Sequence, residues 1–114
     1  MRPASAKAKG RKLQQQVASD IVAAFWLEPD DITSRSMGAS GTDLLLSPAA
    51  RRVFPYAVEC KAVERVNVWE AMLQAEANAD DKVPLVVLRR NRTAPLAVIP
   101  WEEFLWLTQH ARKI

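Results

Sequence analysis

Two apolar stretches, residues 41–46 (GTDLLL) and 56–62 (YAVECKA), decide the predicted fold. Each has the composition of a β-strand, and each carries charge: Asp43 in the first, Glu59 and Lys61 in the second. Because side chains alternate along a strand, Glu59 and Lys61 point to the same face. Charged side chains are uncommon on half-buried strands unless they have a partner or a function. Two carboxylates and an ammonium that converge there could hold a divalent cation and prepare a water for attack on a phosphodiester.

The two strands are close in sequence, which favours an antiparallel hairpin between them. With a turn centred near Arg51, Asp43 would lie opposite Glu59, with their Cβ atoms about 4.5–5.5 Å apart. Carboxylates at that distance repel each other unless a cation or a proton lies between them. The alternative is an ordinary ion pair at a sheet edge, and a one-residue shift in register would turn Asp43 to the other face.

Helices and strands alternate along the rest of the chain. Apolar spacing and turn residues predict helices at 12–28, 67–79 and 101–111, and further strands at 32–36, 84–88 and 96–99. The order is then α-β-β-β-α-β-β-α. This order is typical of an α/β protein with a central mixed β-sheet flanked by helices.

The chain of 114 residues is 49% apolar, which fits one domain at residues 11–114 after a flexible basic arm at 1–10. The first twelve residues hold five basic side chains and no acidic one, whereas acidic residues outnumber basic ones in the remainder. Such an arm either binds a polyanion such as DNA or is a solvated tail.

The single cysteine, Cys60, cannot form an internal disulfide, and no zinc-binding spacing is present. No apolar run approaches the roughly 20 residues that span a bilayer. We therefore expect an intracellular protein without membrane contact. The strand turns Cys60 away from Glu59 and Lys61, so we interpret it as a small buried residue rather than a nucleophile.

The Asp43 and Glu59-Cys60-Lys61 pattern resembles the PD-(D/E)XK nuclease superfamily, and the likeness extends over residues 9–99. Within it, three stretches are similar to archaeal-type Holliday junction resolvases and related phage endonucleases: residues 9–15 (KGRKLQQ), 35–41 (RSMGASG) and, for the phage branch in particular, 46–55 (LSPAARRVFP).

This resemblance implies a restriction-endonuclease-like fold and Mg²⁺-dependent hydrolysis of DNA, with Mn²⁺ as a substitute, leaving 5′-phosphate and 3′-hydroxyl ends. It implies Asp43 and Glu59 as metal ligands, together with the backbone carbonyl of Cys60. Lys61 would orient or help to deprotonate the attacking water, and Gln74 would lie near the site on the following helix. The implied DNA contacts are Lys9, Arg11, Lys12, Gln15, Arg35, Ser36 and Ser40.

The implied substrate is a Holliday junction or other branched DNA, cut inside the cytoplasm, in a phage-infected host if the phage branch applies. A four-way junction has two-fold symmetry, which fits a homodimer. The last helix, 101–111, carries Trp101, Phe104, Leu105 and Trp106. It either forms a dimer interface or packs on its own sheet.

Two positions depart from the pattern. Thr42 replaces the usual proline before the aspartate, and residues 14–16 are glutamines where related resolvases often have a metal-binding glutamate on the first helix. One metal ion per site is therefore expected, and these glutamines either contact DNA or form a polar helix face. Three alternatives stay open: a nicking or duplex endonuclease of phage DNA processing on the same fold, a non-catalytic DNA-binding module, and a small protein-interaction domain.

Overall fold

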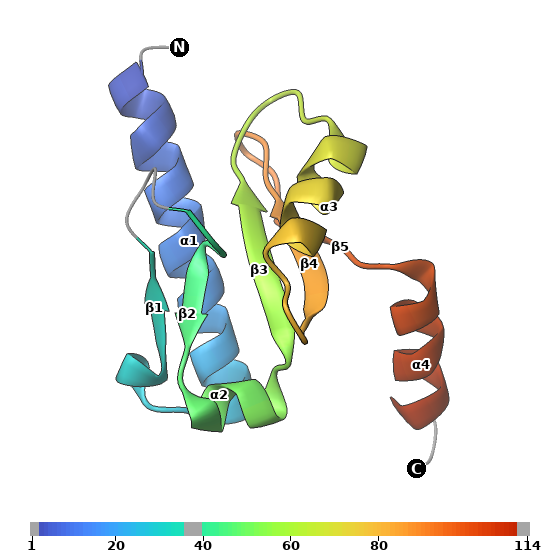
Figure 1. Ribbon diagram of the computed structural model, residues 1–114. Helices are drawn as coiled ribbons and strands as arrows, with labels where there is room; N and C mark the ends of the chain where they lie inside the picture. Colours follow the sequence, from blue (N-terminus) through green and yellow to red (C-terminus); the bar gives the residue numbers. More distant parts are fainter. Residues whose placement is uncertain (1–2, 36–39, 112–114) are drawn as a thin grey trace.

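The computed structural model describes residues 3–35 and 40–111. Its elements, shown in Figure 1, are α1 (Pro3–Phe25), the short 3₁₀ helix η1 (Pro29–Asp31), β1 (Ile32–Ser34), β2 (Leu44–Leu46), α2 (Pro48–Val53), β3 (Tyr56–Lys61), α3 (Val68–Ala77), β4 (Val83–Leu88), β5 (Leu96–Val98) and α4 (Trp101–Ala111). The protein is an α/β fold with mixed strands and flanking helices, as the sequence predicts.

The strands form two ladders. In one, β1 pairs with β2 in antiparallel fashion, with Ile32 opposite Leu46. In the other, β3 pairs with β4 in parallel, with Glu59 beside Val86, and β4 pairs with β5 in antiparallel fashion. Helix α1 packs along β1 and β3, whereas α3 packs on β3 and β4 (Figure 1).

The predicted hairpin between the two charged strands is wrong, because β2 pairs with β1 and β3 pairs with β4. The segment between them is a helix, α2, rather than a turn. Its start has strong sequence signals: the Ser47 hydroxyl accepts a hydrogen bond from the Ala50 N–H, and Pro48 is the first helical residue. The predicted order of elements also lacked η1 and α2.

The predicted flexible arm is also different, because helix α1 begins at Pro3 and continues through the basic segment. Alternating alanines and long basic side chains have high helix propensity, and Gly10 alone is unfavourable there. The helix ends at Phe25. Trp26 has a left-handed backbone (φ 56°), and the Leu27 N–H donates to the Val22 carbonyl at 3.0 Å, a pattern that commonly closes helices.

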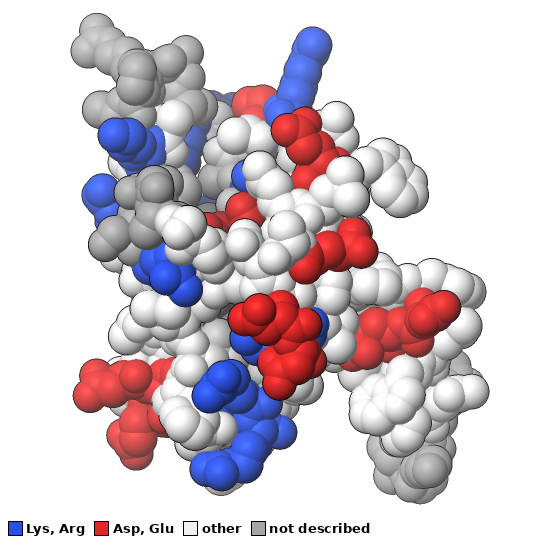
Figure 2. Space-filling model, viewed as in Figure 1, with Lys and Arg blue, Asp and Glu red and all other residues white. Residues whose placement is uncertain are grey.

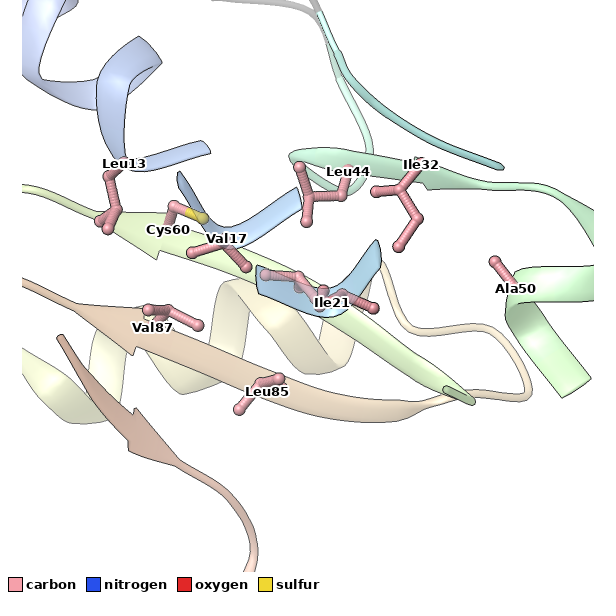
Figure 3. Close-up of a cluster of buried hydrophobic side chains, with 10 residues drawn as sticks. Leu13, Val17, Ile21, Ile32, Leu44, Ala50, Cys60, Leu85 and Val87 are labelled. Atoms are coloured by element: carbon pink, nitrogen blue, oxygen red, sulfur yellow. The ribbon is translucent and has the colours of Figure 1, made fainter. Parts of the chain in front are cut away.

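The main core lies between α1 and the strands (Figure 3). Leu13, Val17 and Ile21 form one stripe of α1, and their spacing of four residues keeps them on one face. They meet apolar side chains of both ladders: Ile32, Leu44, Val58, Cys60, Leu85 and Val87. On the other face, a smaller cluster joins the buried Ala71 and Ala75 of α3 to Val86.

Helix α4 has no buried residue and lies beyond β5, apart from α1 and α3 (Figure 1). The Tyr56 hydroxyl donates a hydrogen bond to the Glu103 carboxylate, which ties its first turn to the start of β3. Among the helices of the described residues, none is long and apolar enough to cross a membrane.

Candidate active site

Asp43 lies where the two ladders meet. It precedes β2, and its backbone N–H donates to the Val58 carbonyl of β3 at 3.0 Å. Its side chain reaches the same strand, since Oδ2 accepts a hydrogen bond from the Cys60 N–H at 2.7 Å. Asp43 therefore lies close to the second strand, as predicted, although the predicted hairpin is absent. Its carboxylate accepts the Cys60 N–H where the carbonyl of a neighbouring strand would do so in a regular sheet.

The backbone of Cys60 faces Asp43 rather than β4. The Arg89 N–H donates to the Lys61 carbonyl at 3.0 Å, which continues the β3–β4 ladder on that side of the strand. Because the backbone groups of successive residues point to alternate sides of a strand, those of Cys60 point to the β2 side. The Cys60 carbonyl oxygen therefore lies on the same edge as the Asp43 carboxylate.

Glu59 and Lys61 lie on the face of β3 opposite to the Cys60 side chain, as alternation predicts. The Lys61 ammonium is 3.5 Å from Glu59 Oε2. Glu59 is only 9% exposed, while Cys60 packs in the core with Leu13 of α1 (Figure 3). A nearly buried carboxylate thus has one cationic partner beside it.

The two carboxylates are held in surroundings that disfavour their negative charge. Burial raises the pKa of Asp43, against the opposing effects of the Cys60 N–H and the charges of Lys61 and Arg35. Burial also raises the pKa of Glu59, and the nearby negative charge of Asp43 raises it further. Burial raises the pKa of the Cys60 thiol to about 12, so it is protonated at neutral pH, and its interpretation as a buried residue is confirmed.

Arg35 supports Asp43 from the opposite side. Its Nε donates to the Thr42 carbonyl at 2.6 Å, and its backbone N–H donates to the Asp43 carbonyl at 2.8 Å. Gly41 has φ +99°, and a Cβ added there would lie 2.9 Å from the Arg35 Cζ. The glycine therefore makes room for the guanidinium.

The remaining residues implied by the resemblance are spread over three regions. Gln74 is exposed on α3, and no hydrogen bond of its side chain to the site occurs in the described part of the chain. Ser40 is exposed, and Ser36 lies outside the described residues. The others lie along the first half of α1, with Lys9 half-buried and Arg11, Lys12 and Gln15 exposed.

Sequence reasoning missed one connection to this site. Arg89 Nη1 donates to Gln16 Oε1 at 2.9 Å, so the last of the three glutamines joins α1 to the end of β4. Gln14 is buried. The sequence feature that could have indicated this contact is the basic run at 89–92, which directly follows a wholly apolar strand.

The donor set fits a hard divalent cation with few protein ligands. No group of three or more His, Cys, Asp or Glu side chains that could hold a metal occurs within residues 3–35 and 40–111. Asp43 and Glu59 repel each other, and a cation between them would relieve that repulsion. With the Cys60 carbonyl they offer oxygen ligands only, which suits Mg²⁺ because it keeps several waters.

A scan against protein-family models and searches of curated proteins and of solved structures returned no match to this chain.

Proposed function

We propose that the protein is a Mg²⁺-dependent DNA endonuclease of the PD-(D/E)XK type. The observation that carries the proposal is the hydrogen bond from the Cys60 N–H to the Asp43 carboxylate. It joins the isolated aspartate to the strand that bears Glu59 and Lys61, so all three charged groups lie within one small region. The phosphodiester of DNA is the substrate class that such a set is suited to hydrolyse.

The metal ion would be held by Asp43, Glu59 and the Cys60 carbonyl, with Mn²⁺ as a substitute for Mg²⁺. When bound, it supplies a Lewis acid for the phosphate oxygens. Lys61 orients the attacking water and offsets the negative charge that develops on phosphorus. The water oxygen gives up a proton to solvent and bonds to phosphorus as the bond to the 3′ oxygen breaks. The phosphate stays on the 5′ side, and the released 3′ oxygen takes up a proton to become a hydroxyl.

The test compares cleavage of labelled four-way junction, nicked duplex and linear duplex on gels, with Mg²⁺ or with chelator. We expect cleavage with Mg²⁺, strongest on the junction, and none with chelator. Asp43→Asn and Lys61→Ala should each reduce the rate at least a hundredfold while DNA affinity changes little. A wild-type protein that cuts none of the three substrates with Mg²⁺ would refute the proposal.

Two other functions use the same fold. A nicking or duplex endonuclease has identical chemistry, so the ranking of the three substrates decides between them. A non-catalytic DNA-binding module would show no Mg²⁺ or Mn²⁺ site by titration calorimetry. The half-buried Asp43 carboxylate and the nearly buried Glu59 carboxylate favour the enzyme, because a scaffold has no need for two charges that repel each other.

We further propose that the protein acts as a homodimer through α4. The groove between α4 and the body of the protein encloses about 1030 Å³, and Phe25, Phe54, Ile99, Trp106 and Leu107 are among its walls. Three large residues of α4 lie outside this groove: Trp101, Phe104 and Leu105. Figure 2 shows that, beyond the acidic groups of its first turn, the surface of α4 on this face is uncharged.

The exposed apolar surface of α4 would supply more than half of what a second copy covers. Trp101 is 69% exposed and stacks on Phe104, with ring centroids 5.8 Å apart. The large apolar residues of α4 together expose on the order of 500 Å², given about 150–250 Å² for each aromatic side chain. A standard interface takes about 800 Å² from each partner. An isologous contact through α4, with the rim of its groove, would reach that size and would bring two sites to a two-fold symmetric DNA.

A further inference from the structure

A basic hollow lies between α1 and the turn that joins β4 to β5. Its lining consists of Ala62 and Asn91, with five basic residues and no carboxylate: Lys9, Lys12, Arg89, Arg90 and Arg92. The acidic Glu64 lies beside it, and its Oε2 accepts a hydrogen bond from the Asn91 N–H at 2.7 Å. The lining is therefore suited to a polyanion.

The turn that carries these arginines is held in place. Thr93 Oγ1 accepts from the Arg90 N–H at 3.1 Å and donates to the Arg90 carbonyl at 3.1 Å. Arg89 is fixed by its hydrogen bond to Gln16 of α1. Arg90 and Arg92 are exposed, and the only ion pair in the described part of the chain joins Lys61 to Glu59. Within the described residues neither guanidinium group forms an ion pair, and the Glu64 carboxylate is bound to the backbone of this turn rather than to an arginine side chain.

Arg92 occupies a backbone conformation that favours glycine. Its φ is +63°, in the left-handed region that long side chains rarely adopt. A structural turn would be better served by glycine or asparagine at this position. The arginine therefore has a cost to the fold, as Trp26 and Asp80 have at their own turns.

The hollow lies at the same end of β3 as Lys61 but on the other face of the strand, because Ala62 packs with Cys60 on the α1 side whereas the Glu59 and Lys61 side chains point the opposite way. Ala62 in its lining follows Lys61, and the Arg89 N–H donates to the Lys61 carbonyl. Figure 1 shows the β4–β5 turn at the same end of the strands as the first half of α1. DNA that is bound at the metal site and continues past this end of the strands would meet these cations.

We propose that Lys9, Lys12, Arg90 and Arg92 bind the sugar–phosphate backbone of DNA beside the cleavage site. Identification of the polyanion as DNA rests on the proposed nuclease function. Among the described residues, the lining has no aromatic side chain on which a base could stack, so the contact is to phosphates and independent of sequence. Arginine suits it because its planar fork binds phosphate oxygens in pairs.

The test measures binding in the absence of cleavage. Fluorescein-labelled four-way junction and linear duplex are titrated with the full chain in chelator, at several salt concentrations, by fluorescence anisotropy. The variant Arg90→Ala/Arg92→Gly is compared with Arg51→Ala/Lys82→Ala, which removes the same charge. These control residues lie on α2 and before β4, at the opposite end of the parallel strands β3 and β4.

We expect the turn variant to bind both DNAs at least tenfold more weakly, with the slope of log affinity against log salt reduced by about 2. The control should change affinity less than twofold. The melting temperature of the turn variant should be unchanged or higher, because glycine relieves the left-handed residue. Equal losses in the two variants, or an unchanged salt slope, would overturn the proposal, and Arg90→Gln alone provides a second variant if the double one unfolds.

The two proposals fail in different ways. If the turn variant binds DNA normally while Asp43→Asn still abolishes cutting, the proposal that the basic hollow binds DNA is refuted and the nuclease proposal is supported. If the turn variant loses DNA binding but the wild-type protein cuts no DNA with Mg²⁺, DNA binding by the hollow is supported and the nuclease proposal is refuted. If the wild-type protein binds no DNA at low salt, the proposal that the hollow binds DNA is also refuted.

Discussion

At the scale of single residues, the site combines two carboxylates whose charge is disfavoured by the fold. Burial raises the pKa of Asp43 and of Glu59, and Asp43 adds repulsion at Glu59. A carboxyl whose pKa is raised on folding stabilises the folded state at pH values below its ordinary pKa. That stability is lost as the pH rises through the raised value. The metal-free protein is therefore destabilised by this pair at neutral pH.

Glu59→Gln should raise the melting temperature of the metal-free protein at neutral pH, because it removes a nearly buried charge beside Asp43. The gain should disappear as the pH falls toward 4.5, the ordinary glutamate pKa, where Glu59 is protonated in the wild type. Mg²⁺ should raise the melting temperature of the wild type and have little effect on the variant. Thermal melts by circular dichroism from acid to neutral pH, with chelator or Mg²⁺, measure both effects. A variant that is less stable at neutral pH would contradict the prediction.

Gly41→Ala should lower the free energy of unfolding by about 1–3 kcal/mol. The cause is twofold, since alanine disfavours φ +99° and its Cβ would collide with the Arg35 guanidinium. Urea denaturation gives the change, with Ser40→Ala as the control because that neighbour is exposed. If the two variants are equally stable, glycine at position 41 is not required for the stability of the protein.

The local parts of the site were predictable from sequence, and the long-range parts were not. Strand alternation correctly predicts that Glu59 and Lys61 share one face of β3 and that the Cys60 side chain lies on the opposite face, in the core. The contact between Asp43 and Cys60 depends on how β2 meets β3, which a local pattern does not encode. The contact of Arg89 with Gln16 joins residues far apart in sequence, so only the fold brings them together.

At the scale of elements, the main errors came from short helices. Sequence periodicity needs several turns to show, and α2 has only six residues. The sequence predicts a turn near Arg51, although a capping residue followed by proline, as at Ser47 and Pro48, equally begins a helix. The parallel pairing of β3 with β4 was also missed, since its connection runs through α3 rather than a tight turn.

Ser47→Ala should destabilise the protein by about 1 kcal/mol, the usual cost of losing an N-cap. The hydroxyl accepts from the Ala50 N–H at 3.1 Å and donates to Asp31 Oδ1 at 2.6 Å, so it joins α2 to η1. Chemical denaturation measures the change, and Ser47→Thr should keep most of the stability. Equal losses in the two variants would show that the hydroxyl is not the stabilising group.

The hydrogen bond between Ser47 and Asp31 should also make the stability of the protein depend on pH in the acid range. Hydrogen bonds from Ser47 and from the Glu28 N–H lower the pKa of Asp31. Their contribution is therefore present above the ordinary aspartate pKa of 3.8 and is lost as the pH falls through the lowered value. The difference in stability between Ser47→Ala and the wild type should accordingly shrink in strong acid.

At the scale of the whole molecule, the candidate site and α4 are separate features. The site lies where β2 meets β3, whereas α4 follows β5 and contacts the start of β3 through Tyr56. A change on the outer face of α4 should therefore alter assembly without altering the metal site. This separation allows the dimer and the chemistry to be tested independently.

Trp101→Glu should weaken the dimer at least tenfold, or about 1.4 kcal/mol, because it introduces a charge into the proposed apolar contact. Trp69→Glu is the matched control, since Trp69 of α3 is 82% exposed and lies away from α4. Sedimentation velocity over a range of protein concentrations should show the wild type and the control as dimers and Trp101→Glu as a monomer. Mg²⁺ should still raise the melting temperature of Trp101→Glu, because its metal ligands are unchanged. A wild type that stays monomeric at every concentration, or a control that dissociates as readily as Trp101→Glu, would exclude α4 as the dimer interface.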